Sequence, residues 1–161
     1  MLEWAAADLD TAALASLLNI STAAVGALLS SGNPLAAENL AQAAAAAVGK
    51  RLSADHQANL AVRSALADAL DRLGKVPDAE QLYTTLLSDQ QRVLGCDHPD
   101  TLATRFELAR VIGHTRLRQA EAEQILRLVL PDMERALGNE HPSTVYARLN
   151  LAREGRPGPA P

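Results

Sequence analysis

The segment LGCDHPDTL, residues 94–102, occurs again downstream as LGNEHPSTV at 137–145 and, in a weaker form, upstream as LSADHQANL at 52–60. The histidines of the three copies lie at positions 56, 98 and 141, which gives spacings of 42 and 43 residues. A sequence repeated at such a period forms one supersecondary unit per copy, and each unit buries its apolar face only against its neighbours. The chain is therefore predicted to be an array of stacked units.

The similarity extends well beyond the histidines. An Ala-Glu-Gln motif recurs at 79–81 and 122–124, and a step of 42 residues back from Gly74 reaches Gly32, so the N-terminal third is a degenerate copy of the same unit. An arginine follows each histidine by seven residues, at Arg63, Arg105 and Arg148. Arginine can bury its aliphatic stem while its charged head reaches a nearby acid. We expect these arginines to be structural more than ligand-binding.

Each unit reads as two helices joined by a turn. Apolar residues recur at helical spacing, as at Leu102, Phe106 and Ala109. Gly74 ends the first helix of a unit, and Pro77 stands near the first turn of the next one. Hydrophobic residues make up 48% of the 161 residues but aromatic residues only 2%. Such an alanine-rich, aromatic-poor core suits closely packed helices, and an all-α fold is predicted.

The Gly…Ala-Glu-x-Leu pattern between paired helices resembles a tetratricopeptide repeat, and the 42-residue period with its LG-x-D/E-H-P-x-T linkers resembles the long kinesin-light-chain type common in high-GC bacteria. The resemblance implies a right-handed α-solenoid of about three and a half repeats. The expected units are about 11–52, 53–95, 96–138 and 139–154, after an N-terminal segment 1–10 and before a disordered Pro/Gly tail, 155–161. The first unit lacks the His-Pro linker, and the glycine of the turn is replaced near Arg116.

Cys96, Asp97 and His98 form a candidate reactive or metal-binding cluster. A nucleophilic cysteine needs a neighbouring base and a low pKa, but the sister linkers carry Ala54 and Asn139 at the position of Cys96. Equivalent histidines of stacked repeats lie about 10 Å apart or more, whereas zinc binds nitrogen at about 2.0–2.1 Å. We therefore expect the histidines to lie near helix N-caps, and we expect no enzyme activity, no metal and no cofactor.

A DNA-binding regulator is the alternative function. Residues 11–31 resemble a helix-turn-helix motif with its turn at Asn19-Ile20-Ser21, and the repeats would then act as a sensor. The reading helix of such a motif would, however, offer no Arg, Lys, Gln or Asn, the side chains that read base edges in pairs of hydrogen bonds. The formal net charge of −4 also disfavours a phosphate-binding surface. Nucleic acid is therefore not expected as a partner, and the repeat interpretation of this segment is favoured.

The resemblance implies a concave groove, lined by first helices, that binds a protein or peptide. By register, the candidate groove residues are Asp68, Asp71, Phe106, Arg110, Tyr146, Leu149 and Arg153. An acidic and apolar peptide or helix would dock near the C-terminal units, with Phe106 and Tyr146 as anchors and Arg110 and Arg153 as carboxylate partners. The alternative is that the two aromatic side chains fill the interface between helices. The module would act as a non-catalytic adaptor or scaffold.

The last unit has no second helix in this sequence, because residues 155–161 read GRPGPAP. Leu149 and Leu151 cannot both face inward on the final helix, so one apolar side is expected to remain exposed and to favour self-association or a partner. No stretch is expected to approach the roughly 20 apolar residues of a membrane span. The single cysteine fits a reducing compartment, and a cytoplasmic location without membrane contact is expected.

Overall fold

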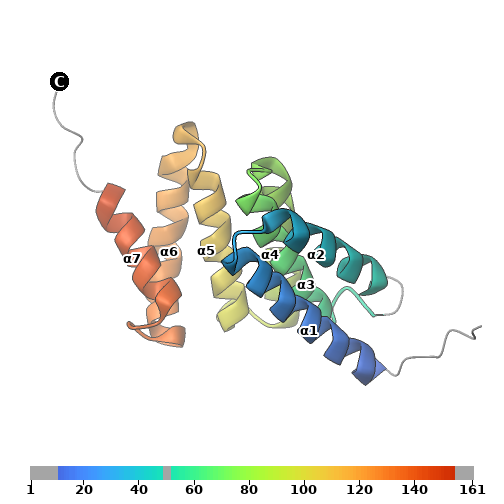
Figure 1. Ribbon diagram of the computed structural model, residues 1–161. Helices are drawn as coiled ribbons and strands as arrows, with labels where there is room; N and C mark the ends of the chain where they lie inside the picture. Colours follow the sequence, from blue (N-terminus) through green and yellow to red (C-terminus); the bar gives the residue numbers. More distant parts are fainter. Residues whose placement is uncertain (1–10, 49–51, 155–161) are drawn as a thin grey trace, which may run out of the picture. The chain divides into compact units, whose positions relative to one another are not determined.

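The computed structural model describes residues 11–48 and 52–154 (Figure 1), so the expected N-terminal segment 1–10 and the expected tail 155–161 lie outside the described residues. The described part is all-α, as predicted, with one short 3-10 helix, η1 (Arg116–Arg118), between two of its helices. Its seven α-helices are α1 (Thr11–Ser30), α2 (Pro34–Val48), α3 (Gln57–Arg72), α4 (Val76–Val93), α5 (Pro99–Gly113), α6 (Gln119–Leu137) and α7 (Pro142–Glu154). The chain divides into two compact units, Met1–Leu73 and Gly74–Pro161, so the division falls between α3 and α4.

The first unit packs α1, α2 and α3 against one another. Its core consists of aliphatic and small side chains, because alanine lets helix backbones approach closely where it faces a neighbouring helix. One cluster contains Leu14, Leu18, Ala44, Leu52, Ala58 and Val62. The other contains Val25, Leu29, Ala37, Ala41, Ala65 and Ala69. Alanine therefore supplies much of this core, in agreement with the composition.

Helix α1 runs without interruption through the segment that resembles the turn of a helix-turn-helix motif. The hydroxyl of Ser21 donates to the carbonyl oxygen of Leu17 at 2.9 Å, and that of Thr22 donates to the carbonyl oxygen of Leu18 at 2.9 Å. Both hydrogen bonds span one helical turn, so these polar residues are accommodated inside the helix. The helix-turn-helix alternative for residues 11–31 is therefore wrong, and with it the DNA-reading function that depended on it.

Helix α1 is also more apolar than expected from the sequence. Its segment Ala13–Ser30 has a mean hydropathy of 1.6 and is long and apolar enough to cross a membrane by length and composition, with 22% of the segment buried. The expectation that no stretch approaches a membrane span is thus wrong for this helix. Core helices pass the same test, and α1 buries Leu14, Leu18, Val25 and Leu29 within its own unit.

The second unit packs α4 against α5, α5 against α6, and α6 against α7. Helices α5, α6 and α7 lie side by side (Figure 1). Their shared core consists of Leu102, Phe106, Ala109, Leu126, Val129, Met133 and Ala147. Phe106 is the largest of these side chains, and Ala147 is the contribution of α7. This core fixes the helices whose outer faces form the candidate site.

The repeated linkers are helix boundaries. Nδ1 of His56, His98 and His141 accepts a hydrogen bond from the backbone N–H two residues later, at 3.2, 3.2 and 3.3 Å. Each histidine thereby satisfies a backbone donor that the first turn of a helix leaves unpaired. The helices before the last two linkers end next to Gly95 and Gly138, whose φ values of 97° and 88° favour glycine. The prediction that the histidines cap helices is confirmed.

The connection between α5 and α6 departs from this pattern. The short helix η1 lies where the glycine of the turn is replaced near Arg116, as the sequence indicated. Arg118 at its end donates to Glu80 of α4 at 2.7 Å and to Glu121 of α6 at 2.8 Å. These hydrogen bonds raise the pKa of Arg118, and the bond from Arg118 holds the pKa of Glu121 below its usual value. An ion-pair bridge thus fixes the start of α6 relative to α4.

The recurring arginines pair with acids of neighbouring helices in the second unit. A nitrogen of Arg105 lies 3.9 Å from a carboxylate oxygen of Asp132 on α6. Arg148 on α7 donates to Glu134 on α6 at 2.7 Å and to the side chain of Asn139 at 3.3 Å. The prediction of a structural role is confirmed for these two positions.

Candidate functional site

The outer face shared by α5 and α7 carries the candidate site. The 43-residue register equates Ala103 of α5 with Tyr146 of α7, and Arg110 with Arg153. Because α5 turns its buried residues toward α4 and α6, Ala103 and Arg110 lie on a strip of that helix that remains partly exposed. We refer to the surface formed by Ala103, Glu107, Arg110 and His114 of α5 with Tyr146 and Asn150 of α7 as the α5–α7 surface.

The two aromatic residues of the prediction have different environments. Phe106 is 3% exposed and fills the core between α5 and α6, as the packing alternative stated. Tyr146 is 51% exposed, and its ring meets that of Phe106 edge to face, with centroids 5.8 Å apart and an interplanar angle of 89°. This contact holds one edge of the Tyr146 ring in place and leaves the rest accessible. Tyr146 is therefore the accessible aromatic residue of the α5–α7 surface.

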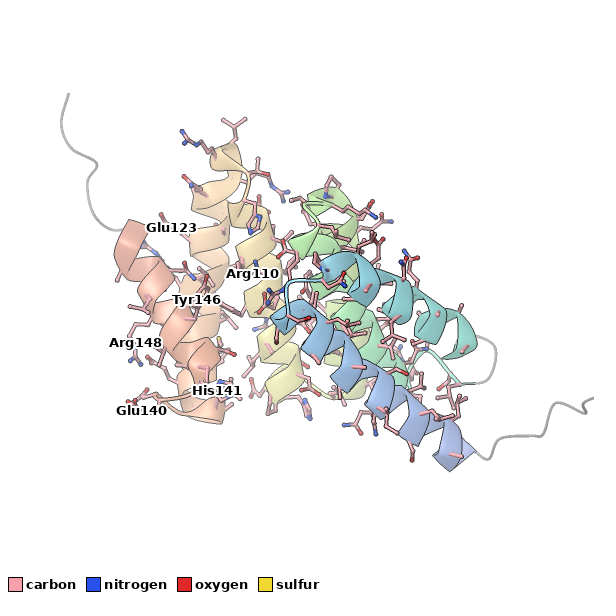
Figure 2. The ribbon with its side chains drawn as sticks, in the orientation of Figure 1. Arg110, Glu123, Glu140, His141, Tyr146 and Arg148 are labelled. Carbon is pink, nitrogen blue, oxygen red and sulfur yellow. The ribbon has the colours of Figure 1, made fainter. Side chains whose placement is uncertain are left out.

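Arg110 is held in position by its own helix. Its Nε donates to Glu107 at 2.7 Å, and one terminal nitrogen lies 3.4 Å from Nε2 of His114 (Figure 2). The side chain is about one quarter exposed, so it reaches the surface without extending freely into water. Glu107 and His114 were not among the predicted site residues. Their spacing of three and four residues from Arg110 was the available signal, because such residues are neighbours on a helix.

The remaining predicted residues lie elsewhere. Asp68 and Asp71 belong to α3 in the first unit, where Asp68 is half-buried and Asp71 is buried. Leu149 of α7 is exposed, but the register equates it with Phe106, on the side of α5 that faces α6. The side chain of Arg153 lies outside the described residues.

The linker that contains Cys96 has no metal site among the described residues, where no group of three or more His, Cys, Asp or Glu side chains could hold an ion. Cys96 is exposed, and its neighbour Asp97 forms an ion pair with Arg135 at 3.3 Å. With His98 acting as an N-cap, this segment joins two helices.

Comparison with known proteins defines the class. A profile described as tetratricopeptide repeat matches residues 59–100 and 118–143. The chain is a tetratricopeptide-like repeat protein, with seven described helices packed in sequence as in such an array. Domains of this class generally bind proteins, and the fold is typically non-catalytic.

The similar solved structures are kinesin light chain repeats. A Podosopora anserina protein described as having nearly identical TPR-like repeats of a putative kinesin light chain is 29% identical, with a TM-score of 0.76, over 86% of this chain. A point variant of it gives 29% and 0.75 over the same share. BtubC (BKLC) from P. vanneervenii gives 18% and 0.72 over 89% of this chain. The chain spans 65% of the length of the first two and 56% of the third. No curated protein matches the chain.

Proposed function

We propose that the protein is a non-catalytic interaction module that binds an acidic and apolar peptide segment along the α5–α7 surface. The observation that carries this proposal is the half-exposed Tyr146 ring, fixed edge-on against the buried Phe106, on the same surface as Arg110. An apolar ligand side chain would pack on Tyr146, and a ligand carboxylate would accept hydrogen bonds from Arg110.

Preorganisation supports this assignment. Binding costs free energy when flexible side chains must be ordered, and this cost is smaller for side chains that are already held. Glu107 directs the guanidinium of Arg110, and Phe106 restrains Tyr146. The guanidinium is a planar fork of N–H donors, and this geometry matches the two oxygens of a carboxylate. The α5–α7 surface therefore presents one aromatic and one cationic contact at low entropic cost.

A random peptide library displayed on phage, selected on the immobilised chain, tests the proposal. We expect enrichment of peptides that combine Asp or Glu with Leu, Phe or Ile. Arg110→Glu should weaken the selected peptide about tenfold or more by isothermal titration calorimetry, because it replaces attraction for a carboxylate with repulsion.

Arg127→Glu is the matched control. Arg127 of α6 is also a surface arginine paired with a glutamate of its own helix, Glu123 at 3.1 Å, but it is not part of the α5–α7 surface. Its substitution should leave the affinity unchanged. Equal affinities of the Arg110→Glu and wild-type proteins would contradict the proposed site.

A further inference from the structure

Helix α5 shows how a first helix of this repeat is covered by the second helix of its unit. Its positions Leu102, Phe106 and Ala109 follow one stripe of the helix and are at most 3% exposed. They share a core with Leu126, Val129 and Met133 of α6. Leucine, phenylalanine and alanine at these positions therefore form a surface that accepts an amphipathic helix.

Helix α7 presents the same stripe without such a cover among the described residues. The 43-residue register equates Val145, Leu149 and Ala152 with the three covered positions of α5. Leu149 is 56% exposed, against 3% for its counterpart Phe106. Val145 is half-buried and Ala152 is exposed. We refer to Val145, Leu149 and Ala152 as the α7 stripe.

The opposite side of α7 is occupied. Ala147 is fully buried in the shared core with α6, and Leu151 packs partly against the same core. The two leucines of the last helix thus face different ways, as the sequence indicated. Residues 155–161 number seven and include three prolines, so their sequence cannot supply a helix of the length of α6. The α7 stripe is an interface surface that the described residues leave open.

We propose that the α7 stripe binds an amphipathic helix of a partner protein, which completes the last repeat in trans. The occupant is specified by α6, which covers the equivalent stripe of α5. It carries a small residue followed by Leu, Val and Met at the spacing of Ala122, Leu126, Val129 and Met133. The site is continuous with the α6–α7 core, so the incoming helix would extend packing that already exists.

Charge supports the same occupant. Arg105 of α5 pairs with Asp132 of α6 at 3.9 Å, and the register equates Arg105 with Arg148 of α7. Arg148 is about half exposed and lies at the edge of α7 (Figure 2). An acid on the incoming helix at the position of Asp132 would therefore meet Arg148. This site uses a different face of α7 from the α5–α7 surface, so the inference does not depend on the proposed function.

The test uses a fluorescein-labelled synthetic peptide with the sequence of residues 119–137, in which Pro131→Ala favours a continuous helix. Fluorescence anisotropy measures its binding to the intact chain. We expect saturable binding, and we expect Leu149→Asp in the protein to weaken it about tenfold or more, since a charge then faces the apolar stripe. Because Leu149 is exposed, this substitution should leave the circular dichroism spectrum and the unfolding midpoint of the protein unchanged.

Two controls distinguish the outcomes. Ile20→Asp replaces another exposed apolar side chain, 66% exposed on α1, and should not change the affinity. A peptide with Leu126→Asp should not bind, because its apolar face is interrupted. Absence of binding, or equal binding to the Leu149→Asp protein, would overturn the proposal. A dimer in sedimentation equilibrium that Leu149→Asp dissociates, without peptide binding, would also overturn it by identifying a second copy as the occupant.

Discussion

Phe106→Ala is expected to lower the free energy of unfolding by about 3–5 kcal/mol. The side chain is 3% exposed and is the aromatic member of the core that joins α5, α6 and α7. Its removal loses the transfer free energy of a phenyl ring and leaves a cavity that the surrounding helices fill only in part. Urea denaturation followed by circular dichroism at 222 nm measures the change.

Tyr146→Ala is the matched control for this prediction. Tyr146 contacts the same ring edge to face but is half exposed, so its removal should cost only about 1 kcal/mol. The comparison separates a packing residue from an accessible one. If Phe106→Ala were no more destabilising than Tyr146→Ala, the placement of Phe106 in the core would be contradicted.

The triple substitution His56→Ala, His98→Ala and His141→Ala is expected to cost about 3 kcal/mol of stability in total, near 1 kcal/mol for each cap. Each Nδ1 accepts a backbone N–H at the first turn of a helix, and alanine leaves that donor without the side-chain acceptor. The three caps belong to different helices, so their effects should add. Thermal and urea unfolding of the triple variant measure the loss.

Asparagine at the same three positions provides the control, because its side-chain oxygen can accept the same backbone N–H. The asparagine variant should retain most of the stability that the alanine variant loses. Added Zn²⁺ should not raise the unfolding midpoint of the wild-type protein. A stabilisation by Zn²⁺ that both triple variants abolish would restore the metal-site interpretation of the histidines.

The helices and their boundaries were largely predictable from the sequence, because their signals are local. Gly95 and Gly138 mark helix ends by backbone conformation alone, and His98 with Pro99 marks a helix start. The replacement of the turn glycine near Arg116 likewise indicated the irregular connection that η1 forms.

The errors and gaps arose where several local interpretations were physically possible. Asn19 and Ser21 suited a turn, but a serine hydroxyl can also bond to a carbonyl of its own helix, as Ser21 does with Leu17. For the candidate site, the register identified which positions of α5 and α7 correspond but not which side of the helix meets a neighbour. Phe106 and Leu149 share a register position, yet α6 buries the first and leaves the second exposed.

Ligand binding by the α5–α7 surface can be mapped residue by residue. Titration of the ¹⁵N-labelled chain with the phage-selected peptide, followed by two-dimensional NMR, reports the backbone amides that the peptide perturbs. We expect chemical-shift changes concentrated at Ala103, Glu107, Arg110, Tyr146 and Asn150, with the outer face of α6 unaffected. Changes confined to the outer face of α6 or to α1, with the α5–α7 surface unperturbed at saturation, would contradict the proposed binding surface.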